Sequence, residues 1–463
     1  MQETWATSGL DVHLETRGPG VRAGLEAALR EAVQAGRLAA GTRLPSSRAL
    51  AADLAIARNT VADAYGQLVA EGWLTSRQGS GTWVSATGTA PAPQARPATS
   101  VPRLRFDLRA GSPDLSAFPR PAWLAAARRA LNAAPSRALG YGDPRGRPEL
   151  RTALAAYLAR ARGVRATPDR IVICTGFTQG LALLCQVLRG QGARTVAVEE
   201  YGQQGTLTAL AARSLKPALL PVDSSGAVLD AAGDADAMLL TPAHQFPLGP
   251  ALSAPRRAQA ARWAVAGGLI VEDDYDGEFR FDRQPVGALQ ALAPEHIVYA
   301  GTASKTLAPG LRLGWLVLPA SLVDAVAAAK AGADAHTGAF EQLTLAEFIS
   351  SGGYDRHIRR ARLAYRRRRN WLLSALAADA RVVRVTGIAA GLHAVAELPG
   401  QLAEAAAVAS AARSSVAVDR LGSYALGRHH RGQALVIGYA GPPGHAYSTA
   451  VARLCSAIGA AAG

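Results

Sequence analysis

Between residues 171 and 318, short runs of apolar residues alternate with longer segments rich in alanine and leucine. A run of four or five apolar residues has the length of a buried strand, and the segments between the runs are long enough for helices. This alternation predicts an α/β sandwich whose functional residues lie at the strand ends. The expected strands are 171–175, 195–198, 237–241, 269–272, 297–301 and 315–318.

The lysine content singles out one residue, which follows the fifth of these runs. Lysine and arginine together number 50, and lysine occurs only at Lys216, Lys305 and Lys330, so the other 47 are arginine. A guanidinium stays protonated, whereas a desolvated lysine amine can lose its proton and condense with an aldehyde. Thr302 and Ser304 precede Lys305, and Arg312 follows it as a donor for an anion such as phosphate. We expect Lys305 to carry chemistry, rather than to be an ordinary surface lysine.

Two other strand ends carry residues suited to a bound ligand. After the first expected strand, residues 175–180 open a helix, so that Gly176, Phe177 and Thr178 would offer backbone N–H groups to a phosphate. After the fourth strand, residues 272–276 read Glu-Asp-Asp-Tyr-Asp. A solvated turn is the alternative for such an acidic run, but a buried strand leads directly into it, which favours a functional carboxylate. His244 and His393 lack the spacing of metal ligands, and no metal site is expected.

The first 84 residues have a different pattern from the rest of the chain. Helices are expected over 20–36, from Pro45 and Ser46 to about residue 54, and over 58–71. Two strands, 73–76 and 81–84, follow around a glycine-containing turn. This order predicts a winged helix-turn-helix that binds double-stranded DNA. The expected DNA contacts are Arg43, Ser46, Arg48, Arg58, Asn59, Thr60, Arg77, Gly79 and Ser80.

Charge leaves a second interpretation of this segment open. Residues 18–84 contain seven arginines and five acidic residues, so a protein-interaction module is the alternative to a DNA-binding domain. The whole chain has a net charge of +15, which favours an anionic partner such as nucleic acid. Residues 356–369 contain eight arginines in fourteen positions. We interpret this run as a solvated helix face, with a second DNA-contacting surface as the alternative.

Length and composition set the domain organisation and the compartment. A chain of 463 residues, 49% hydrophobic, is expected to form two or three globular domains. We predict an α+β multidomain protein with a winged helix over 1–84, an Ala/Pro-rich linker over 85–103, a large domain over 104–320, and a linking helix with a small α/β domain over 321–463. Three scattered cysteines and the absence of an export signal or apolar span predict a cytoplasmic protein with no membrane anchor.

Several motifs carry a family resemblance. Leu-Pro-Ser at 44–46, Arg-Asn-Thr-Val at 58–61, Ala-Tyr at 64–65 and Glu-Gly at 71–72 resemble the GntR family of bacterial regulators. Residues 241–249, 272–276 and 304–312 resemble the fold-type I pyridoxal phosphate (PLP) enzymes, the aspartate aminotransferase family. The combination resembles the MocR subfamily of PLP-dependent transcription regulators, and it implies a C-terminal fold-type I transferase domain.

The resemblance implies a role for each site residue. Lys305 would hold PLP as a Schiff base (imine), Asp273 would lie at the pyridine nitrogen, and Tyr275 would bond the phenolic oxygen. Tyr201 would stack on the ring. The phosphate would be held by Gly176, Phe177, Thr178, Thr302, Ser304 and Arg312, and by Tyr141 from a neighbouring subunit, which implies a homodimer.

The chain departs from the family patterns at four positions. Ala55 and Ala57 stand where the winged helix usually has glycine and serine. Phe246 replaces the asparagine usual in working aminotransferases, and Val436 replaces the arginine that clamps a substrate carboxylate. Losing that clamp removes much of the orientation that transamination needs, although Arg428 or Arg431 is a candidate substitute.

The sequence therefore predicts a PLP-dependent DNA-binding transcription regulator. It would sense PLP and/or an amine or amino-acid ligand through the lysine imine and control genes of vitamin B6, amine or amino-acid metabolism. The alternative is a PLP-dependent aminotransferase with an accessory DNA-binding domain. A third interpretation is a PLP-independent repressor whose enzyme-like domain serves for dimerisation.

Overall fold

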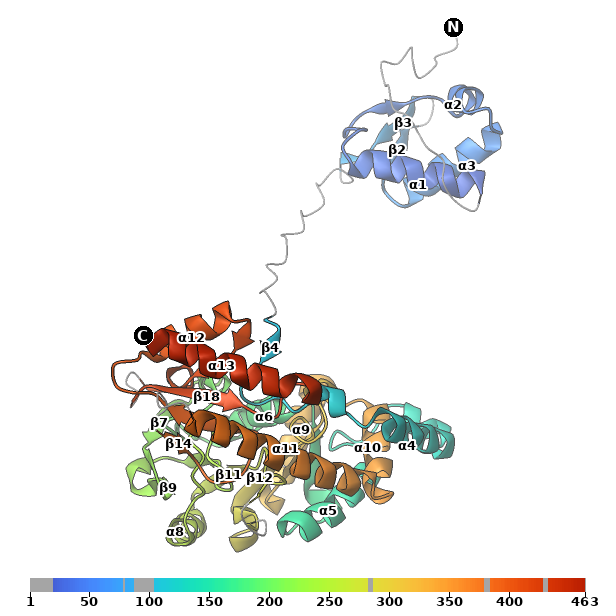
Figure 1. Cartoon of the computed structure of the whole chain (residues 1–463). Helices are drawn as coiled ribbons and strands as arrows, with labels where there is room; N and C mark the ends of the chain where they lie inside the picture. Colours follow the sequence, from blue (N-terminus) through green and yellow to red (C-terminus); the bar gives the residue numbers. More distant parts are fainter. Residues whose placement is uncertain are drawn as a thin grey trace. The chain divides into compact units, whose positions relative to one another are not determined.

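The computed structural model describes residues 20–77, 80–86, 104–281, 286–378, 384–427 and 432–462. The chain divides into two compact units, residues 1–102 and 103–463 (Figure 1). Of the residues discussed above, Gly79, Arg428 and Arg431 lie outside the described ranges. Within those ranges, none of the helices has the length and apolar content that crossing a membrane requires.

The first unit contains the expected helices and hairpin. Its elements are α1 (Val21–Gln34), β1 (Arg43–Leu44), α2 (Ser47–Asp53), α3 (Arg58–Ala70), β2 (Leu74–Arg77) and β3 (Gly81–Val84). The strands pair antiparallel in the order β1-β3-β2. Strand β1 was not predicted, because two residues are too few to show a hydrophobic period. Pro45 and Ser46 do precede a helix, and the Ser46 hydroxyl oxygen accepts a hydrogen bond from the Ala49 N–H at 3.2 Å.

A seven-stranded sheet forms the centre of the described part of the second unit. Its strands are β5 (Ile171–Cys174), β6 (Thr195–Glu199), β7 (Lys216–Leu220), β10 (Ala237–Leu240), β11 (Leu269–Asp273), β12 (Ile297–Thr302) and β13 (Gly314–Val317). The order is β5-β13-β12-β11-β10-β6-β7; β13 runs in the opposite direction to the other six strands and is antiparallel to both of its neighbours, β5 and β12. The six predicted strands are present. Edge strand β7 was not predicted, because its residues are mostly exposed and include Pro217.

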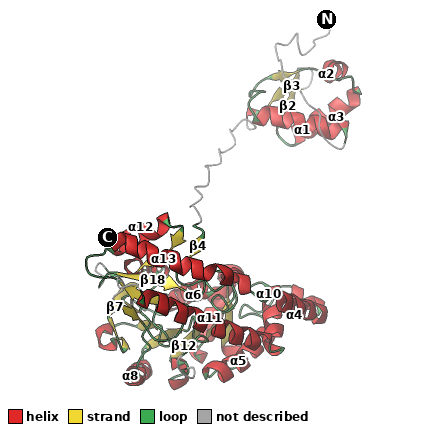
Figure 2. Cartoon of the chain, viewed as in Figure 1, coloured by secondary structure: helices red, strands yellow, loops and turns green. Residues whose placement is uncertain are grey.

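Helices cover both faces of this sheet, as Figure 2 shows in red around the yellow strands. The covering helices include α5 (Pro148–Arg162), α6 (Phe177–Gly190), α8 (Ala254–Val265), α9 (Val323–Asp334) and α10 (Ala339–Ser350). Val172 and Cys174 pack into a cluster with residues of α6 and α9, whereas Ile171 and Ile173 pack with residues of α5 and α10. Alternate residues of one strand thus face two different helix layers, which confirms the predicted sandwich.

The remaining helices and strands flank this sandwich. Further elements of the described chain are β4 (Phe106–Asp107), α4 (Arg120–Ala133), α7 (Gln204–Ala211), β8 (Val222–Asp223), β9 (Gly226–Ala227), α11 (Gly353–Ala377), β14 (Arg384–Thr386), β15 (His393–Glu397), α12 (Glu404–Arg413), β16 (Val416–Ala417), β17 (Asp419–Arg420), β18 (Ala434–Gly438) and α13 (Tyr447–Ala462). A second, antiparallel sheet, β14-β15-β18-β17, lies in the C-terminal part of this unit. Strand β4 pairs parallel with β16, so the beginning of the second unit is tied to its C-terminal part.

Candidate functional site

One edge of the large sheet gathers the residues expected to hold a cofactor. The parallel strands end at this edge, and β13 begins there because it runs in the opposite direction. Gly176, Tyr201, Asp273 and Lys305 lie at or just beyond the ends of β5, β6, β11 and β12. Arg312 lies just before β13. Segments far apart in the sequence therefore contribute to one place, as is usual for open α/β sheets.

Lys305 is largely buried and lies close to acidic groups. Its Nζ donates a hydrogen bond to the carbonyl oxygen of Gly111 at 2.6 Å. Burial lowers the pKa of Lys305, and the carboxylates of Asp273 and Asp276 partly oppose this shift. A lowered pKa increases the fraction of neutral amine, which is the form that attacks an aldehyde.

The pKa of Asp273 is shifted in the opposite direction to that of Lys305. Burial and repulsion from Asp274 raise its pKa well above the usual range, and Lys305 opposes that shift. A protonated nitrogen base placed against Asp273 would supply a positive charge, and that charge would stabilise the ionised carboxylate. The group therefore fits a ligand that carries a pyridinium nitrogen.

The other acids of residues 272–276 have partners of their own. Both oxygens of Glu272 accept backbone N–H groups, from Leu289 and Gln290, each at 2.8 Å. Glu272, Asp274 and Asp276 are all buried. The run is therefore part of the interior, and the alternative of a solvated turn is wrong.

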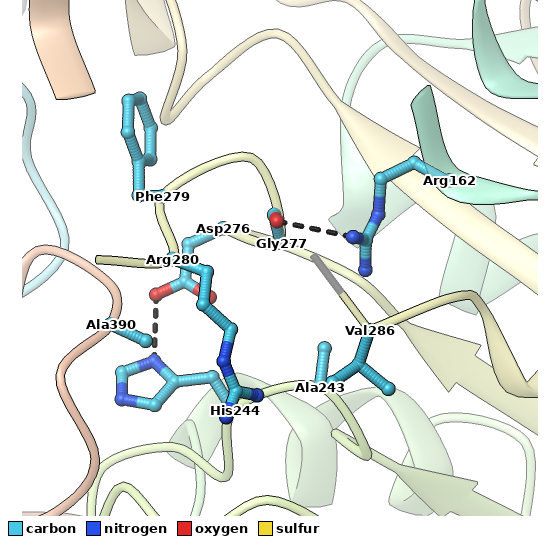
Figure 3. A pocket seen from close by; sticks show the side chains of 9 residues that line it. All are labelled: Arg162, Ala243, His244, Asp276, Gly277, Phe279, Arg280, Val286 and Ala390. Carbon is cyan, nitrogen blue, oxygen red and sulfur yellow. Dashed lines mark hydrogen bonds and ion pairs between the residues drawn. The ribbon is translucent and has the colours of Figure 1, made fainter. Parts of the chain in front are cut away.

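Asp274 makes a buried ion pair that links a distant helix to the site. Arg162, at the end of α5, donates to its two oxygens at 2.6 and 3.0 Å, and the Tyr299 hydroxyl donates at 2.8 Å. Arg162 also donates to the carbonyl of Gly277 at 3.2 Å (Figure 3). The sequence does not reveal this pair, because 112 residues separate the partners and no local pattern connects them.

Asp276 and Tyr275 meet a histidine from another loop. His244 Nδ1 lies 2.9 Å from Asp276 Oδ2 and 3.0 Å from the Tyr275 hydroxyl. The His244–Asp276 contact borders a cavity of about 10 Å³, room for roughly one water molecule (Figure 3). Burial raises the pKa of Tyr275 well above its usual range, so the hydroxyl keeps its proton and remains a donor. No local pattern in the sequence points to this role of His244.

Aromatic side chains fill the position where an asparagine was expected. Phe246 is buried and its ring contacts those of Tyr275, His393 and Tyr424, with centroids 5.0 to 5.7 Å apart. His393 donates through Nε2 to the Pro247 carbonyl at 2.9 Å, and burial lowers its pKa to about 3. A neutral, apolar wall therefore replaces the amide of working aminotransferases.

The phosphate end of the expected site is built around a glycine. Gly176 has φ +91°, and a Cβ there would lie 3.1 Å from both terminal nitrogens of Arg312. Arg312 donates to the Thr175 carbonyl at 2.5 Å, which holds its guanidinium over this glycine. A side chain at Gly176 would crowd the guanidinium of Arg312, so with glycine here the guanidinium and the N-terminus of α6 lie close together, and both can donate to an anion.

Thr302 and Ser304 form the neighbouring side of the expected phosphate site. The Ser304 N–H donates to the Thr302 hydroxyl oxygen at 3.1 Å, and the two hydroxyls are 2.9 Å apart. Phe177 and Thr178 are the first residues of α6, as expected. The donors present fit a phosphate group.

Tyr201 and Val436 belong to one apolar cluster. Both are buried, and they pack with Val395, Leu421 and Ala434. Val436 lies in β18 opposite Val395, so an aliphatic side chain stands where a carboxylate clamp was sought. Tyr141, by contrast, is 95% exposed. Its ring packs edge-on against that of His336, with the two ring centroids 6.2 Å apart.

The expected DNA contacts lie on the surface of the first unit. Arg43, Ser46, Arg48, Arg58, Asn59, Arg77 and Ser80 are exposed, and Thr60 is half-buried. Arg58 to Thr60 form the first turn of α3. The guanidinium carbons of Arg43 and Arg77 lie 6.0 and 5.8 Å from the Trp83 ring, which places both cations on the β-hairpin.

Comparison with known proteins agrees with this architecture. The family of bacterial regulatory proteins called gntR matches residues 22–84, and aminotransferase class I and II matches residues 106–433. The probable rhizopine catabolism regulatory protein MocR of Rhizobium meliloti is 35% identical over 366 residues, covering 73% of this chain and 74% of that protein. The pyridoxine biosynthesis transcriptional regulator PdxR of Corynebacterium glutamicum is 33% identical over 373 residues, covering 79% and 81%.

Solved structures of enzymes resemble the second unit. The α-aminoadipate aminotransferase LysN of Thermus thermophilus is 27% identical with a TM-score of 0.69, covering 77% of this chain and 92% of that structure. It was solved with a phosphopyridoxyl ligand. A gntR-type winged helix followed by an aminotransferase fold, with the transcription regulators MocR and PdxR as relatives, identifies the family: the chain belongs to the MocR subfamily of GntR transcription regulators.

Proposed function

We propose that this protein is a cytoplasmic, PLP-dependent transcription regulator that senses PLP, an amine or an amino acid at Lys305. Its targets would be genes of vitamin B6, amine or amino-acid metabolism. The observation that carries the proposal is Lys305 itself. It is a largely buried amine with a lowered pKa beside Asp273, in a chain that also carries a DNA-binding domain.

Each site residue would contact a different part of the cofactor. Lys305 would hold its aldehyde carbon covalently, and Asp273 would keep a proton on its ring nitrogen. The Tyr275 hydroxyl would donate to the phenolic oxygen, and Tyr201 would stack on the ring. Gly176, Phe177, Thr178, Thr302, Ser304 and Arg312 would bind the phosphate. When bound, the cofactor supplies a carbon centre that exchanges reversibly between Lys305 and a free amine.

A second copy of the chain is the expected partner. Exposed apolar side chains lie on α4, in the segment 136–141 and at the start of α10, and both α4 and residues 136–139 pack on α10. They are Leu124, Leu131, Leu139, Phe340 and the nearly fully exposed Tyr141. Such a group is costly to leave in water, and a homodimer would cover it.

The first test is the absorption spectrum of the purified protein with added PLP, beside Lys305→Ala. We expect a visible band for covalently bound cofactor in the wild type and its loss in the variant, because alanine offers no amine. Lys330→Ala is a matched control, since Lys330 is a buried lysine paired with Asp334. A band that persists in Lys305→Ala contradicts the assignment.

DNA binding with and without PLP tests the regulatory step. We expect the cofactor to change the affinity of the wild type for its operator and to leave Lys305→Ala unchanged. An aminotransferase is the second candidate, because a 2-aminoadipate transaminase of Thermus thermophilus is 30% identical over 301 residues. If the protein turns over an amino donor and a keto acid, and PLP has no effect on its DNA affinity, the protein is an aminotransferase and the proposed sensing function is wrong.

A further inference from the structure

Two of the eight arginines in the arginine-rich segment of α11 bond to other parts of the unit. Arg362 donates to the Glu278 carbonyl at 2.9 Å. Arg368 donates to the carbonyls of Ala440 and Pro442 and to Asp114 at 2.6 to 2.9 Å. These two arginines hold α11, the long orange helix in Figure 1, against the rest of the unit.

Five other arginines of this helix point away from that contact. Arg356, Arg359, Arg360, Arg366 and Arg367 are exposed, and within the described ranges none of them forms an ion pair. We call these five residues the arginine stripe. At 100° per residue they fall within about a third of the helix circumference, opposite the buried Ile358, Ala361 and Tyr365. The stripe extends along about 16 Å of the helix axis.

The stripe is unfavourable for the helix by itself. Like charges three and four residues apart repel one another, as Arg356 does with Arg359 and Arg360. A solvated face usually mixes both signs, so that neighbouring charges offset each other. Here the nearby Asp355 pairs with Arg160 of α5 at 2.7 Å instead. A polyanion would remove the repulsion.

The overall charge distribution points to the same partner. Residues 1–102 contain nine arginines and eight acidic residues, a net charge of +1. Because the whole chain carries +15, residues 103–463 carry +14. The excess positive charge is therefore outside the unit that contains the winged helix. DNA presents one phosphate charge per about 1.7 Å of duplex, and its neutralisation by arginine releases counterions.

A shallow groove adjoins the stripe. Its volume is about 500 Å³, and it lies between the end of α5 and the first half of α11. Arg160, Arg359 and Arg362 line it. Asp355, which pairs with Arg160, and Glu278 also line the groove, so its positive charge without an ion-pair partner among the described residues lies on the α11 side, at Arg359.

We propose that the arginine stripe of α11 is a second DNA-binding surface, which contacts the phosphate backbone while the winged helix reads the bases. The proposal rests on the DNA-binding function of the chain. Contacts of this kind position a protein without reading sequence, so the stripe would add affinity and salt dependence but no base preference.

The test uses the full-length protein and a 60-base-pair duplex carrying a sequence that the wild type enriches from a random pool. The variant Arg359→Gln/Arg360→Gln/Arg366→Gln removes three charges from the stripe. The control Arg194→Gln/Arg213→Gln/Arg413→Gln removes three exposed charges elsewhere in the same unit. DNA affinity is measured between 50 and 200 mM salt, and thermal melting confirms that each variant is folded.

We expect the stripe variant to bind about tenfold or more weakly at 100 mM salt, with the slope of log affinity against log salt reduced by about 2 to 3. The control should keep nearly the wild-type slope. Equal losses in both variants would mean that net charge acts at long range, and unchanged affinity in the stripe variant would mean a solvated face; either result overturns the proposal. Failure of the wild type to enrich any sequence would instead contradict the regulatory function.

Discussion

At the scale of single residues, burial controls the ionisation of several carboxyls near the candidate site. Glu199 ends β6 and accepts hydrogen bonds from the Thr241 hydroxyl and from Gln245. Burial raises its pKa to about 7, and it likewise raises those of Glu272 and Glu278 to about 7. Carboxyls with raised pKa values keep their protons in the folded state at pH values where an unfolded chain has lost them.

Glu199→Gln tests this effect. Between the unfolded pKa of about 4.5 and the folded pKa of about 7, the folded protein binds the extra proton, so the free energy of unfolding falls as pH rises through this window. Between pH 5 and pH 8, we expect the free energy of unfolding of the variant to fall by about 1 to 3 kcal/mol less than that of the wild type. His393 has a lowered pKa, so below pH 6.5 its contribution to the free energy of unfolding rises with pH. Both proteins contain His393, so this contribution cancels when the variant is compared with the wild type.

Unfolding of the second unit, followed by denaturant titration at several pH values, measures this difference. The exposed glutamate variant Glu341→Gln is the control and should follow the wild-type pH dependence. Parallel curves for the wild type and Glu199→Gln would contradict the raised pKa.

A backbone position in the first unit gives a second prediction. Ala55 has φ +53°, in the left-handed region where glycine is favoured. We expect Ala55→Gly to stabilise the winged helix by about 0.5 to 1 kcal/mol, since the relief of strain outweighs the added freedom of the unfolded chain. Ala52→Gly, in the exposed last turn of α2, should destabilise it by up to a similar amount. Thermal unfolding would measure both, and a loss of stability in Ala55→Gly would show that this position is unstrained.

At the scale of elements, the Arg162–Asp274 pair joins the end of α5 to the loop after β11. Asp274→Asn would leave Arg162 buried without a counter-charge, so we expect a loss of about 3 to 5 kcal/mol in stability. Asp355→Asn breaks the exposed pair with Arg160 and should cost less than about 1 kcal/mol. Chemical denaturation of the two variants would distinguish them. Similar losses would show that burial adds nothing to the value of the first pair.

Helices and strands were predictable where a pattern within their own residues identifies them. Both faces of β5 are buried, and its continuous apolar run identified it. Helix α2 was found from its capping serine. Strands β1 and β7 were missed, because a strand of two residues has no period and an exposed edge strand has no apolar run. These strands are specified by the partners they meet in the fold.

At the scale of the whole molecule, the candidate site draws on segments that are far apart in the chain. The Lys305 amine meets the carbonyl of Gly111 across 194 residues, and Arg312 meets Thr175 across 137. The direction of β13 brings Arg312 to the same edge as Lys305. The parallel sheet makes this convergence a matter of topology, which is why the motifs at strand ends could be assigned to one site.

The sequence by itself determined the order of the long helices and of the buried strands, and it singled out Lys305, because these depend on local patterns and on residue chemistry. Only the tertiary structure decided the partners. It paired Asp274 with Arg162 and Asp276 with His244, and it separated the two anchoring arginines of α11 from the exposed ones. The physical reason is that burial and charge pairing depend on distances between segments, and such distances exist only once the chain has folded.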